Sequence, residues 1–478
     1  MTLTRQVYLL DPQELPPETI AVTFAKTSRS PESFKEIADE LNNEKSAQFH
    51  EKWVVGYGHS SVAEHAVLHI AVENVSRLAV ETLEGNRLAS YTEKSTRYQK
   101  WDQDSFFIPD ELNENPDLKN LYIETNQFLF EAYQTALPKI QVWIGEQFPQ
   151  REGESESAWE RRIRSKYVDI GRFFLPASAL ANVGMTINAR ALEHAIQKML
   201  SHPLSEVRQM GEEIKKVSQD NVPTLVKYAD KMPYLMETEQ KIKAASASAN
   251  IQHTPYNWCQ MVQMDQKAEK RVLAAVLYRY GQSSYQDVWD YIDQCSQAEL
   301  QNLARQITEN LGKFDSPIRE LEYANFTFDL VMDQGAFFEI KRHRMATQTA
   351  QPLSTMLGYA VPVGIRETGL EPLYNEAMQK AHQTYQKLAL WNAEVASYVV
   401  PNAYNRRVLI QANFRSLDHL IQLRSAQNAH FSVRRLVQRM AEILEDQFPL
   451  SKLWLRRLPD ETWQDVEEKH FLETQHPV

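Results

Sequence analysis

The sequence predicts a mixed chain of helices and strands, built from two copies of one α/β domain. Three observations lead to this prediction. The chain has 478 residues, more than one ordinary hydrophobic core accommodates. Two separate sequence patterns each occur once in either half of the chain. Between the halves, residues 236–252 are polar and rich in alanine and serine, which predicts a linker or a weak helix.

The first repeated pattern is a strand followed by a helix and a loop. It covers residues 63–98 in the first half and 321–356 in the second. Apolar and polar residues mostly alternate over residues 326–332, which is typical of a strand. Ser76 and Asp333 stand where each strand gives way to a helix, and both residue types favour the helix N-cap.

The second repeated pattern runs from a proline to an asparagine that opens a helix. Pro176 and Asn188 are 12 residues apart, and so are Pro401 and Asn413. Equal spacing in a second pattern is poorly explained by chance. We therefore predict three segments: a first domain at residues 1–235, a linker at 236–252 and a second domain at 253–478.

Composition and charge limit the class of function. The net charge is −11, whereas a general nucleic-acid binder needs a broad positive surface. No apolar run reaches the roughly 18 residues of a membrane span, and the N-terminus has no secretory pattern. We therefore expect a cytoplasmic protein without nucleic-acid or membrane partners. Cys259 and Cys295 are too far apart for a CxxC metal site, and neither has a nucleophile context, so we predict no metal and no cysteine catalysis.

Short motifs then occur in the same order along the chain. Residues 58–65 read GHSSVAEH, and residues 85–98 read GNRLASYTEKSTRY. The second half has RHRMATQTAQPLSTM at 342–356, and the later helices begin NARAL at Asn188 and NFRSL at Asn413. On these motifs, which span most of both halves, the chain resembles the flavin-dependent thymidylate synthases (ThyX).

This resemblance implies an α+β fold with two tandem ThyX-like domains, each a mixed sheet packed with long helices. It implies the reductive methylation of dUMP to dTMP, with FAD as cofactor and with methylenetetrahydrofolate and NADPH as co-substrates. The family places no cysteine nucleophile on the uracil, in agreement with the cysteine analysis. Because the usual assembly of the family is a homotetramer with sites between subunits, the resemblance implies a homodimer of two-domain chains.

In the first half, the resemblance marks a set of dUMP-binding residues. Glu93, Ser95 and Arg97 stand where the loop of the family grips dUMP, and Arg172 stands at another substrate-binding position. A hydroxyl and a guanidinium can bond phosphate oxygens, although a solvated polar loop would have the same composition. In the second half the corresponding positions hold other residues: Ala350, Pro352, Ser354 and Ser397.

In the second half, the resemblance indicates candidate residues that contact the FAD cofactor and the uracil base. Arg342, His343 and Arg344 form the triplet that suits an FAD pyrophosphate and, at Arg342, the dUMP phosphate. Arg424 corresponds to the arginine that favours the ionised uracil N3, and it is the candidate catalytic residue. Asn413 lies 11 residues before Arg424 on one helix stripe and is a candidate cofactor contact.

The first half keeps only some of the residues that correspond to the Arg-His-Arg triplet, Asn413 and Arg424 of the second half. Gly85 and Asn86 replace the first two members of the triplet, and Met199 replaces the late arginine. Arg87 and Asn188 remain as candidate cofactor residues.

Two further features bear on the ligands. His59, Ser61 and Glu64 match a flavin-contacting turn of the family. Glu339 stands three residues before Arg342, where the family usually has a neutral glutamine near the dUMP phosphate. A carboxylate at that position repels a phosphate unless an arginine intervenes.

The losses in the two halves are reciprocal, because each half keeps the set that the other has lost. A symmetric dimer has two equivalent interface sites, and fusion followed by loss of one site leaves this pattern. We therefore predict one composite dUMP site per pair of domains, within one chain or between chains. Two alternatives remain: a degenerate non-catalytic flavin- or nucleotide-binding homologue with a regulatory or scaffold role, and a flavoenzyme with another pyrimidine substrate.

Overall fold

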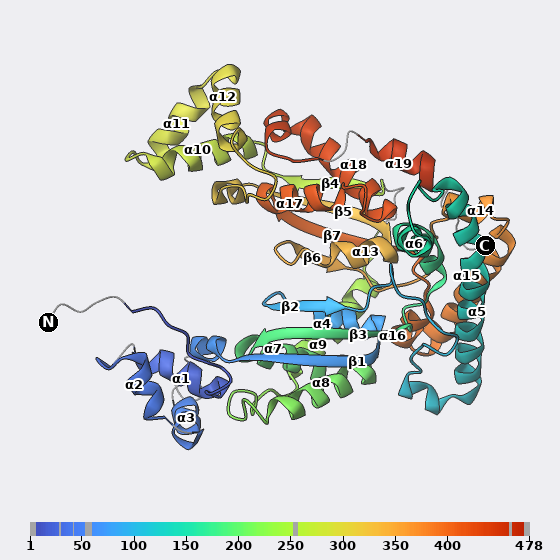
Figure 1. The fold of residues 1–478 in the computed structure, drawn as a ribbon, viewed down its shortest axis with the longest axis horizontal. Helices are drawn as coiled ribbons and strands as arrows, with labels where there is room; N and C mark the ends of the chain where they lie inside the picture. The colour runs from blue at the N-terminus through green and yellow to red at the C-terminus, as the bar shows by residue number, and fades with distance from the viewer. Residues whose placement is uncertain are drawn as a thin grey trace. The chain divides into compact units, whose positions relative to one another are not determined.

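The chain folds into two compact units, shown in Figure 1. The structure is a computed structural model that describes residues 6–27, 30–41, 43–52, 60–251, 257–457 and 461–472. Unit 1 comprises the chain up to Lys94, Phe106–Pro116 and Ser178–Gln252. Unit 2 comprises Ser95–Ser105, Asp117–Ala177 and the chain from His253 onward. Two segments that precede residue 236 therefore fold with unit 2, and the division into 1–235, 236–252 and 253–478 stays a prediction.

Unit 1 is built on a three-stranded sheet with strand order β1-β3-β2. The strands are β1 (Val67–Ser76), β2 (Ala89–Glu93) and β3 (Leu180–Asn188). The helices that follow them in the chain are α4 (Arg77–Glu84), α7 (Ala189–Leu200) and α8 (Ser205–Ser218). The other helices are α1 (Pro17–Thr27), α2 (Phe34–Asp39), α3 (Asn43–Phe49), the 3₁₀ helices η2 (Ser60–His65) and η3 (Asp110–Glu114), and α9 (Pro233–Ser248), which buries no residue and overlaps the predicted linker.

Unit 2 is built on a four-stranded sheet with strand order β4-β5-β7-β6. The strands are β4 (Cys259–Met264), β5 (Asn325–Asp333), β6 (Thr347–Ala350) and β7 (Asn405–Asn413). The segments from the first half are α5 (Pro116–Gln147), α6 (Glu156–Gly171) and η4 (Arg172–Phe174). The remaining helices are α10 (Ala268–Tyr280), α11 (Tyr285–Gln294), α12 (Gln297–Thr308), η5 (Arg319–Tyr323), α13 (Gln334–Ile340), α14 (Val363–Glu367), α15 (Glu371–Trp391), α16 (Ala393–Ala396), η6 (Ser397–Val399), α17 (Phe414–Arg424), α18 (Phe431–Gln447), η7 (Pro449–Leu453) and α19 (Trp463–His470).

The same local arrangement occurs in both units. The sequence β1–α4–β2 in unit 1 corresponds to β5–α13–β6 in unit 2, and β3–α7 corresponds to β7–α17. Ser76 Oγ accepts the Ala79 N–H at 2.9 Å, and Asp333 Oδ1 accepts the Ala336 N–H at 2.8 Å, so the predicted helix caps are confirmed. The α+β class is confirmed as well. Where mixed sheets were expected, however, every strand pair in the described part of the chain is antiparallel.

Tyr91 and Gln348 perform the same task at corresponding positions of the two sheets. The single proton of the Tyr91 hydroxyl is shared between the carbonyl oxygens of Leu83 at 3.0 Å and Asn86 at 3.1 Å. Gln348 Nε2 donates to the carbonyl oxygens of Ile340 at 3.1 Å and His343 at 3.0 Å. In each unit a strand side chain therefore holds the turn that follows the helix, although the two residue types differ.

The core of unit 2 lies between its sheet and the helices packed on it. The rings of Phe326 and Phe414 are 4.5 Å apart, and those of Phe414 and Trp454 are 5.2 Å apart. The buried Trp454 donates its Nε1–H to the Ala304 carbonyl at 3.1 Å, which attaches α12 to this core. No helix of the described chain is both long enough and apolar enough to cross a lipid bilayer.

The two prolines of the second repeated pattern face one another inside unit 2. Pro176 and Pro401 form an isolated antiparallel bridge. Around them the Ala177 N–H donates to Val400 O at 3.0 Å, and the Asn402 N–H donates to Leu175 O at 2.9 Å. Equivalent residues thus pair with each other, as in the contact at a two-fold axis. This pairing attaches the chain segment of α5, α6 and η4 to the strands of the second half.

We predict that Tyr91→Phe lowers the free energy of unfolding by about 1 kcal/mol, because the hydrogen bond of the Tyr91 hydroxyl to the turn after α4 is lost. Chemical denaturation of the purified protein measures this change. Tyr234→Phe is the matched control, since Tyr234 lies on the exposed helix α9 with 71% of its surface accessible. An equal effect of the two substitutions would contradict the proposed task of Tyr91.

Candidate functional site

The charged residues at the centre of the candidate site belong to unit 2. Its basic part is four arginines, which we call the arginine cluster: Arg97, Arg172, Arg342 and Arg424. Two of them come from the first half of the chain, in the 95–105 loop and in η4, and two come from the second half, after α13 and at the end of α17. The charges of all four act on the carboxyl group of Glu339. Arginines from both predicted halves of the composite site therefore belong to one compact unit.

Arg97 is fixed by a carboxylate. Its Nε and Nη2 donate to the two carboxylate oxygens of Asp169 at 2.8 and 2.7 Å, and Nη2 also donates to Asn428 O at 3.1 Å. This two-pronged geometry is the strongest that a guanidinium makes with a carboxylate. Burial opposes the charge on Arg97, but Asp169 outweighs it and raises the pKa of the guanidinium. Ser95 Oγ accepts the Arg97 N–H at 3.2 Å and so shapes the same loop.

Arg172 is almost completely buried, with 1% of its surface exposed. Its Nη1 donates to Thr96 Oγ1 at 3.2 Å, and its Nη2 donates to Gly335 O at 3.1 Å. Among the described residues its Nε has no hydrogen-bond partner. Burial lowers the pKa of this guanidinium. The charges of Asp169, Glu339 and Asp333 offset part of this effect of burial.

The close approach to Gly335 requires a residue without a side chain. A Cβ on Gly335 would lie 2.9 Å from Asp333 Oδ1 and 3.3 Å from Arg172 Nη2. The carbonyl of Gly335 is thereby available to Arg172 at the start of α13.

Arg424 joins Glu339 to His343. Its Nη1 donates to Glu339 Oε2 at 2.6 Å, and its Nε donates to His343 Nε2 at 3.1 Å. The His343 ring therefore accepts a hydrogen bond and is neutral. Burial lowers the pKa of His343 to about 3, and the charge of Arg424 acts in the same direction. Arg424 is thus held in one orientation by two partners.

Glu339 is ionised despite its burial. Burial alone would raise its pKa, but the charges of Arg172, Arg424, Arg342 and Arg97 lower it below the usual value. Its side chain is 7% exposed. An arginine does intervene at this carboxylate, which is the condition under which an acid is compatible with a phosphate site.

The other second-half candidates lie at the ends of elements. Arg342 is exposed and Arg344 half-buried in the turn after α13, where the His343 N–H donates to Ile340 O at 3.0 Å. Asn413 caps α17, its Oδ1 accepting the Ser416 N–H at 2.8 Å. Asn188 caps α7 in unit 1 through the Ala191 N–H at 2.9 Å. Both asparagines therefore cap a helix, in addition to the cofactor contact that the sequence predicts for them.

The remaining candidates belong to unit 1. Glu93 forms a buried ion pair with Arg77 at 2.9 Å. Glu64, in η2, forms an exposed ion pair with Arg190, and the nearby Ser61 is exposed. Arg87 is exposed after α4. His59 lies outside the described residues.

Sequence motifs did not identify three members of the site: Thr96, Asp169 and Gly335. Asp169 stands one helical turn before Arg172, so its spacing gave a weak signal. Thr96 and Gly335 act only because Arg172 approaches them from a distant part of the chain, for which no local pattern exists. In the described residues no group of histidine, cysteine and acidic side chains is arranged to hold a metal ion.

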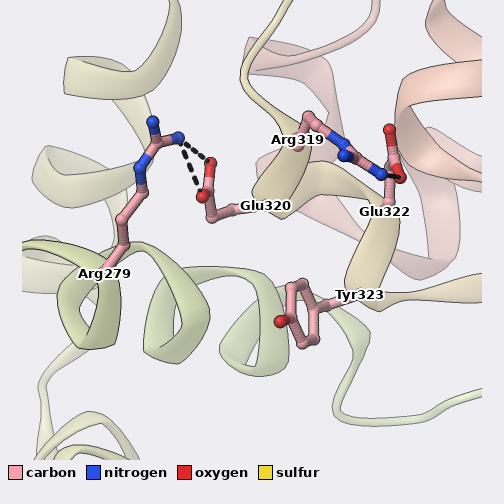
Figure 2. A pocket seen from close by; sticks show the side chains of 5 residues that line it. All are labelled: Arg279, Arg319, Glu320, Glu322 and Tyr323. Carbon is pink, nitrogen blue, oxygen red and sulfur yellow. Dashed lines mark hydrogen bonds and ion pairs between the residues drawn. The ribbon is translucent and has the colours of Figure 1, made fainter. Parts of the chain in front are cut away.

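A separate hollow in unit 2 provides a contrast. Its volume is 560 Å³, and it is lined by Arg279, Arg319, Glu320, Glu322 and Tyr323 (Figure 2). Each lining arginine has a carboxylate partner: Arg279 bonds Glu320 at 2.9 Å, and Arg319 bonds Glu322 at 3.2 Å. The lining charges cancel, so this hollow has no excess charge to attract an anion.

Comparisons with known proteins bear on the identity of the chain. The profile of the family described as "Thymidylate synthase complementing protein" (Thy1) matches residues 10–224 and 260–450. A UPF0159 protein of Chlamydia pneumoniae is 30% identical over 435 residues, covering 87% of this chain and 82% of that protein. A flavin-dependent thymidylate synthase of Clostridium tetani is 28% identical over 215 residues, covering 45% of this chain and 82% of that protein.

Solved structures are similar as well. A flavin-dependent thymidylate synthase of Helicobacter pylori, complexed with FAD and dUMP, has 15% sequence identity and a TM-score of 0.32. The likeness covers 42% of this chain and 100% of that chain.

We predict that His343 makes the protein less stable in mild acid. Its folded pKa of about 3 lies below its unfolded value of 6.5, so the unfolded chain binds the proton more readily. The stability is fully present above pH 6.5 and falls as the pH drops toward 3, by up to about 2 kcal/mol at pH 5. The measurement is the difference in unfolding free energy between pH 7 and pH 5 for the wild type and for His343→Gln. The variant should lose less stability, and an unchanged difference would contradict the assignment.

Proposed function

The chain belongs to the family of thymidylate synthase complementing proteins, and from this premise we propose that it is an FAD-dependent thymidylate synthase. The proposed reaction is the reductive methylation of dUMP to dTMP, with methylenetetrahydrofolate and NADPH as co-substrates. The observation that carries the proposal is the arginine cluster. Arg97 and Arg172 come from the first half of the chain, which has the predicted dUMP-binding residues. Arg342 and Arg424 come from the second half, which has the complete Arg-His-Arg triplet and the candidate catalytic arginine.

The proposed substrate contacts follow from charge. A phosphate monoester carries two negative charges near neutral pH, and guanidinium groups bind it by charge-assisted hydrogen bonds. Arg97, Arg172 and Arg342 are the proposed phosphate ligands. Glu93 and Ser95, which precede Arg97 in the chain, stay candidate substrate residues.

The residues present also fit the cofactor. Arg342 and Arg344 flank His343 in the turn after α13, and two guanidinium groups suit the pyrophosphate of FAD. FAD, when bound, supplies the hydride transfer that the reductive methylation requires. We propose Asn413 as an additional contact in the second half, with Arg87, Asn188, His59, Ser61 and Glu64 as the remaining candidates.

Arg424 is the proposed catalytic residue. A fixed guanidinium beside the uracil ring favours negative charge at N3 and O4, which makes C5 a better nucleophile. Glu339 and His343 hold the Arg424 guanidinium in place, so little reorganisation is needed when charge develops.

The cysteines support a route without a thiolate nucleophile. Burial raises the pKa of the Cys259 thiol to about 12, so it is protonated at neutral pH. Activation of the pyrimidine by Arg424 is consistent with this chemistry. We further propose a cytoplasmic homodimer of two-domain chains.

We predict that Arg97→Ala and Arg424→Ala each lower kcat/KM for dTMP formation by at least about 100-fold and abolish rescue of a thymidine auxotroph. The first substitution removes a phosphate ligand, and the second removes the charge beside the base. The control is Arg366→Ala on the short helix α14, whose side chain is 54% exposed and pairs only with its neighbour Glu367 among the described residues.

The same assay separates the proposed function from its rival. Wild-type protein that binds dUMP and FAD but forms no dTMP would favour a non-catalytic regulatory or scaffold homologue. Full activity in both variants would exclude the arginine cluster as the site. Circular dichroism of each variant shows whether a loss of activity reflects unfolding.

We predict that reconstituted protein binds about one FAD per chain, because the Arg-His-Arg triplet is complete only in the second half. Flavin absorbance of the desalted protein, divided by chain concentration, measures the stoichiometry. Arg344→Ala should weaken flavin retention, whereas the control Arg366→Ala should change it little. A stoichiometry near two would mean that Gly85-Asn86-Arg87 still binds flavin.

A further inference from the structure

The N-terminal part of unit 1 repeats the beginning of the second half of the chain. Residues 6–11 read QVYLLD, and residues 260–265 read QMVQMD. Asp11 Oδ1 accepts the backbone N–H of the second residue after it at 2.8 Å, and Asp265 Oδ1 does the same at 3.0 Å. Each aspartate therefore closes the same kind of turn, and the segments before the two turns are equivalent.

Two glutamates show the same equivalence beyond the turn. Glu18 and Glu269 are the second residues of α1 and α10. Glu18 Oε1 accepts the N–H groups of residues 224 and 225, which follow α8, at 2.9 and 3.3 Å. Glu269 Oε1 accepts the N–H groups of residues 450 and 451, which follow α18. The first helix of each half is thus attached to its unit in the same way.

The two equivalent segments differ in their pairing. In unit 2, β4 ends one residue before Asp265 and pairs with the outer edge of β5. In unit 1, β1 corresponds to β5, and it is an edge strand of the described sheet. Residues 6–10 belong to no strand, and the side chains of Val7 and Leu9 are 91% and 93% exposed. Unit 1 therefore has both an apolar segment in solvent and a sheet edge open to an added strand.

The equivalence also determines a register. Counted from the asparagine that each strand pairs with, Phe328 in β5 corresponds to Ile70 in β1. Met261 lies opposite Phe328, and it stands four residues before Asp265, just as Val7 stands four residues before the aspartate of its own turn. Val7 would therefore lie opposite Ile70, on the buried face of the sheet, where a β-branched side chain is favoured.

We propose that residues 6–10 dock on the outer edge of β1 in the same chain, as a fourth strand that completes the sheet of unit 1. The segment supplies backbone hydrogen bonds to the edge and moves Val7 from solvent to the buried face. The turn at Asp11 already has the hydrogen bond that ends β4 in unit 2. Docking also covers an edge that could otherwise pair with another chain. This inference does not depend on the proposed function.

Amide hydrogen exchange of the full-length protein tests the docking. We expect the amides of residues 7–10 to exchange at least tenfold more slowly than in an unstructured peptide of the same sequence. Val7→Asp should remove this protection, because the docked strand would bury an unpaired charge. Tyr8→Asp is the matched control and should stay within twofold of the wild type, since Tyr8 corresponds to Val262, which is 49% exposed in β4. Exchange of the wild-type segment at the unstructured rate would overturn the proposal.

A disulfide identifies the edge and the chain to which the segment docks. By the same register Leu9 would lie opposite His69, so Leu9→Cys with His69→Cys should form a disulfide within one chain under mild oxidation. The background is Cys295→Ser, because Cys259 is buried. The control pairs Leu9→Cys with Ser90→Cys, since Ser90 lies on the opposite edge strand, out of disulfide reach. A disulfide between two chains, or none with position 69, would overturn the assigned docking.

Discussion

The buried guanidinium of Arg172 connects the parts from which the candidate site is built. It bonds the Thr96 hydroxyl in the 95–105 loop and the Gly335 carbonyl at the start of α13, while itself standing in η4. These three segments are far apart in the sequence and meet at one side chain. Burying a guanidinium is costly unless its donors are matched, so the geometry around Arg172 constrains all three segments. The position of Arg97 on one side and of Glu339 on the other depends on that constraint.

Much of the local fold could be predicted from the sequence. Alternating residues followed by a capping Ser76 or Asp333 indicate a strand and then a helix, because both signals are local. The assignment of α5 and α6 to unit 2 could not be predicted in this way. It depends on contacts such as the Pro176–Pro401 bridge, in which residues more than 200 positions apart pair. Strand direction is equally non-local, which is why the antiparallel sheets differ from the expected mixed ones.

In the candidate site as well, the residues that stand in local motifs could be predicted and those that depend on distant contacts could not. Arg97, Arg172 and Arg424 were identifiable because they stand in motifs, and the structure gathers them around Glu339. Gly335 and Asp169 were not, since a glycine that makes room and a carboxylate that aligns an arginine have no pattern of their own. Asn188 and Asn413 show the reverse case. Their repeated position is fully explained by helix capping, so repetition alone does not establish a ligand contact.

The pairing of Pro176 with Pro401 has an evolutionary consequence. When two identical subunits meet at a two-fold axis, every mutation at the contact appears twice, and a change must be tolerated on both sides at once. Here the two faces are encoded by separate codons of one gene, so each can drift alone. Arg172 and Ser397, which occupy corresponding positions four residues before these prolines, illustrate the result: one is a buried cation at the site, and the other is a small hydroxyl that bonds the Leu353 carbonyl at 2.9 Å. Fusion thus freed each half to specialise at positions that a symmetric ancestor had to keep alike.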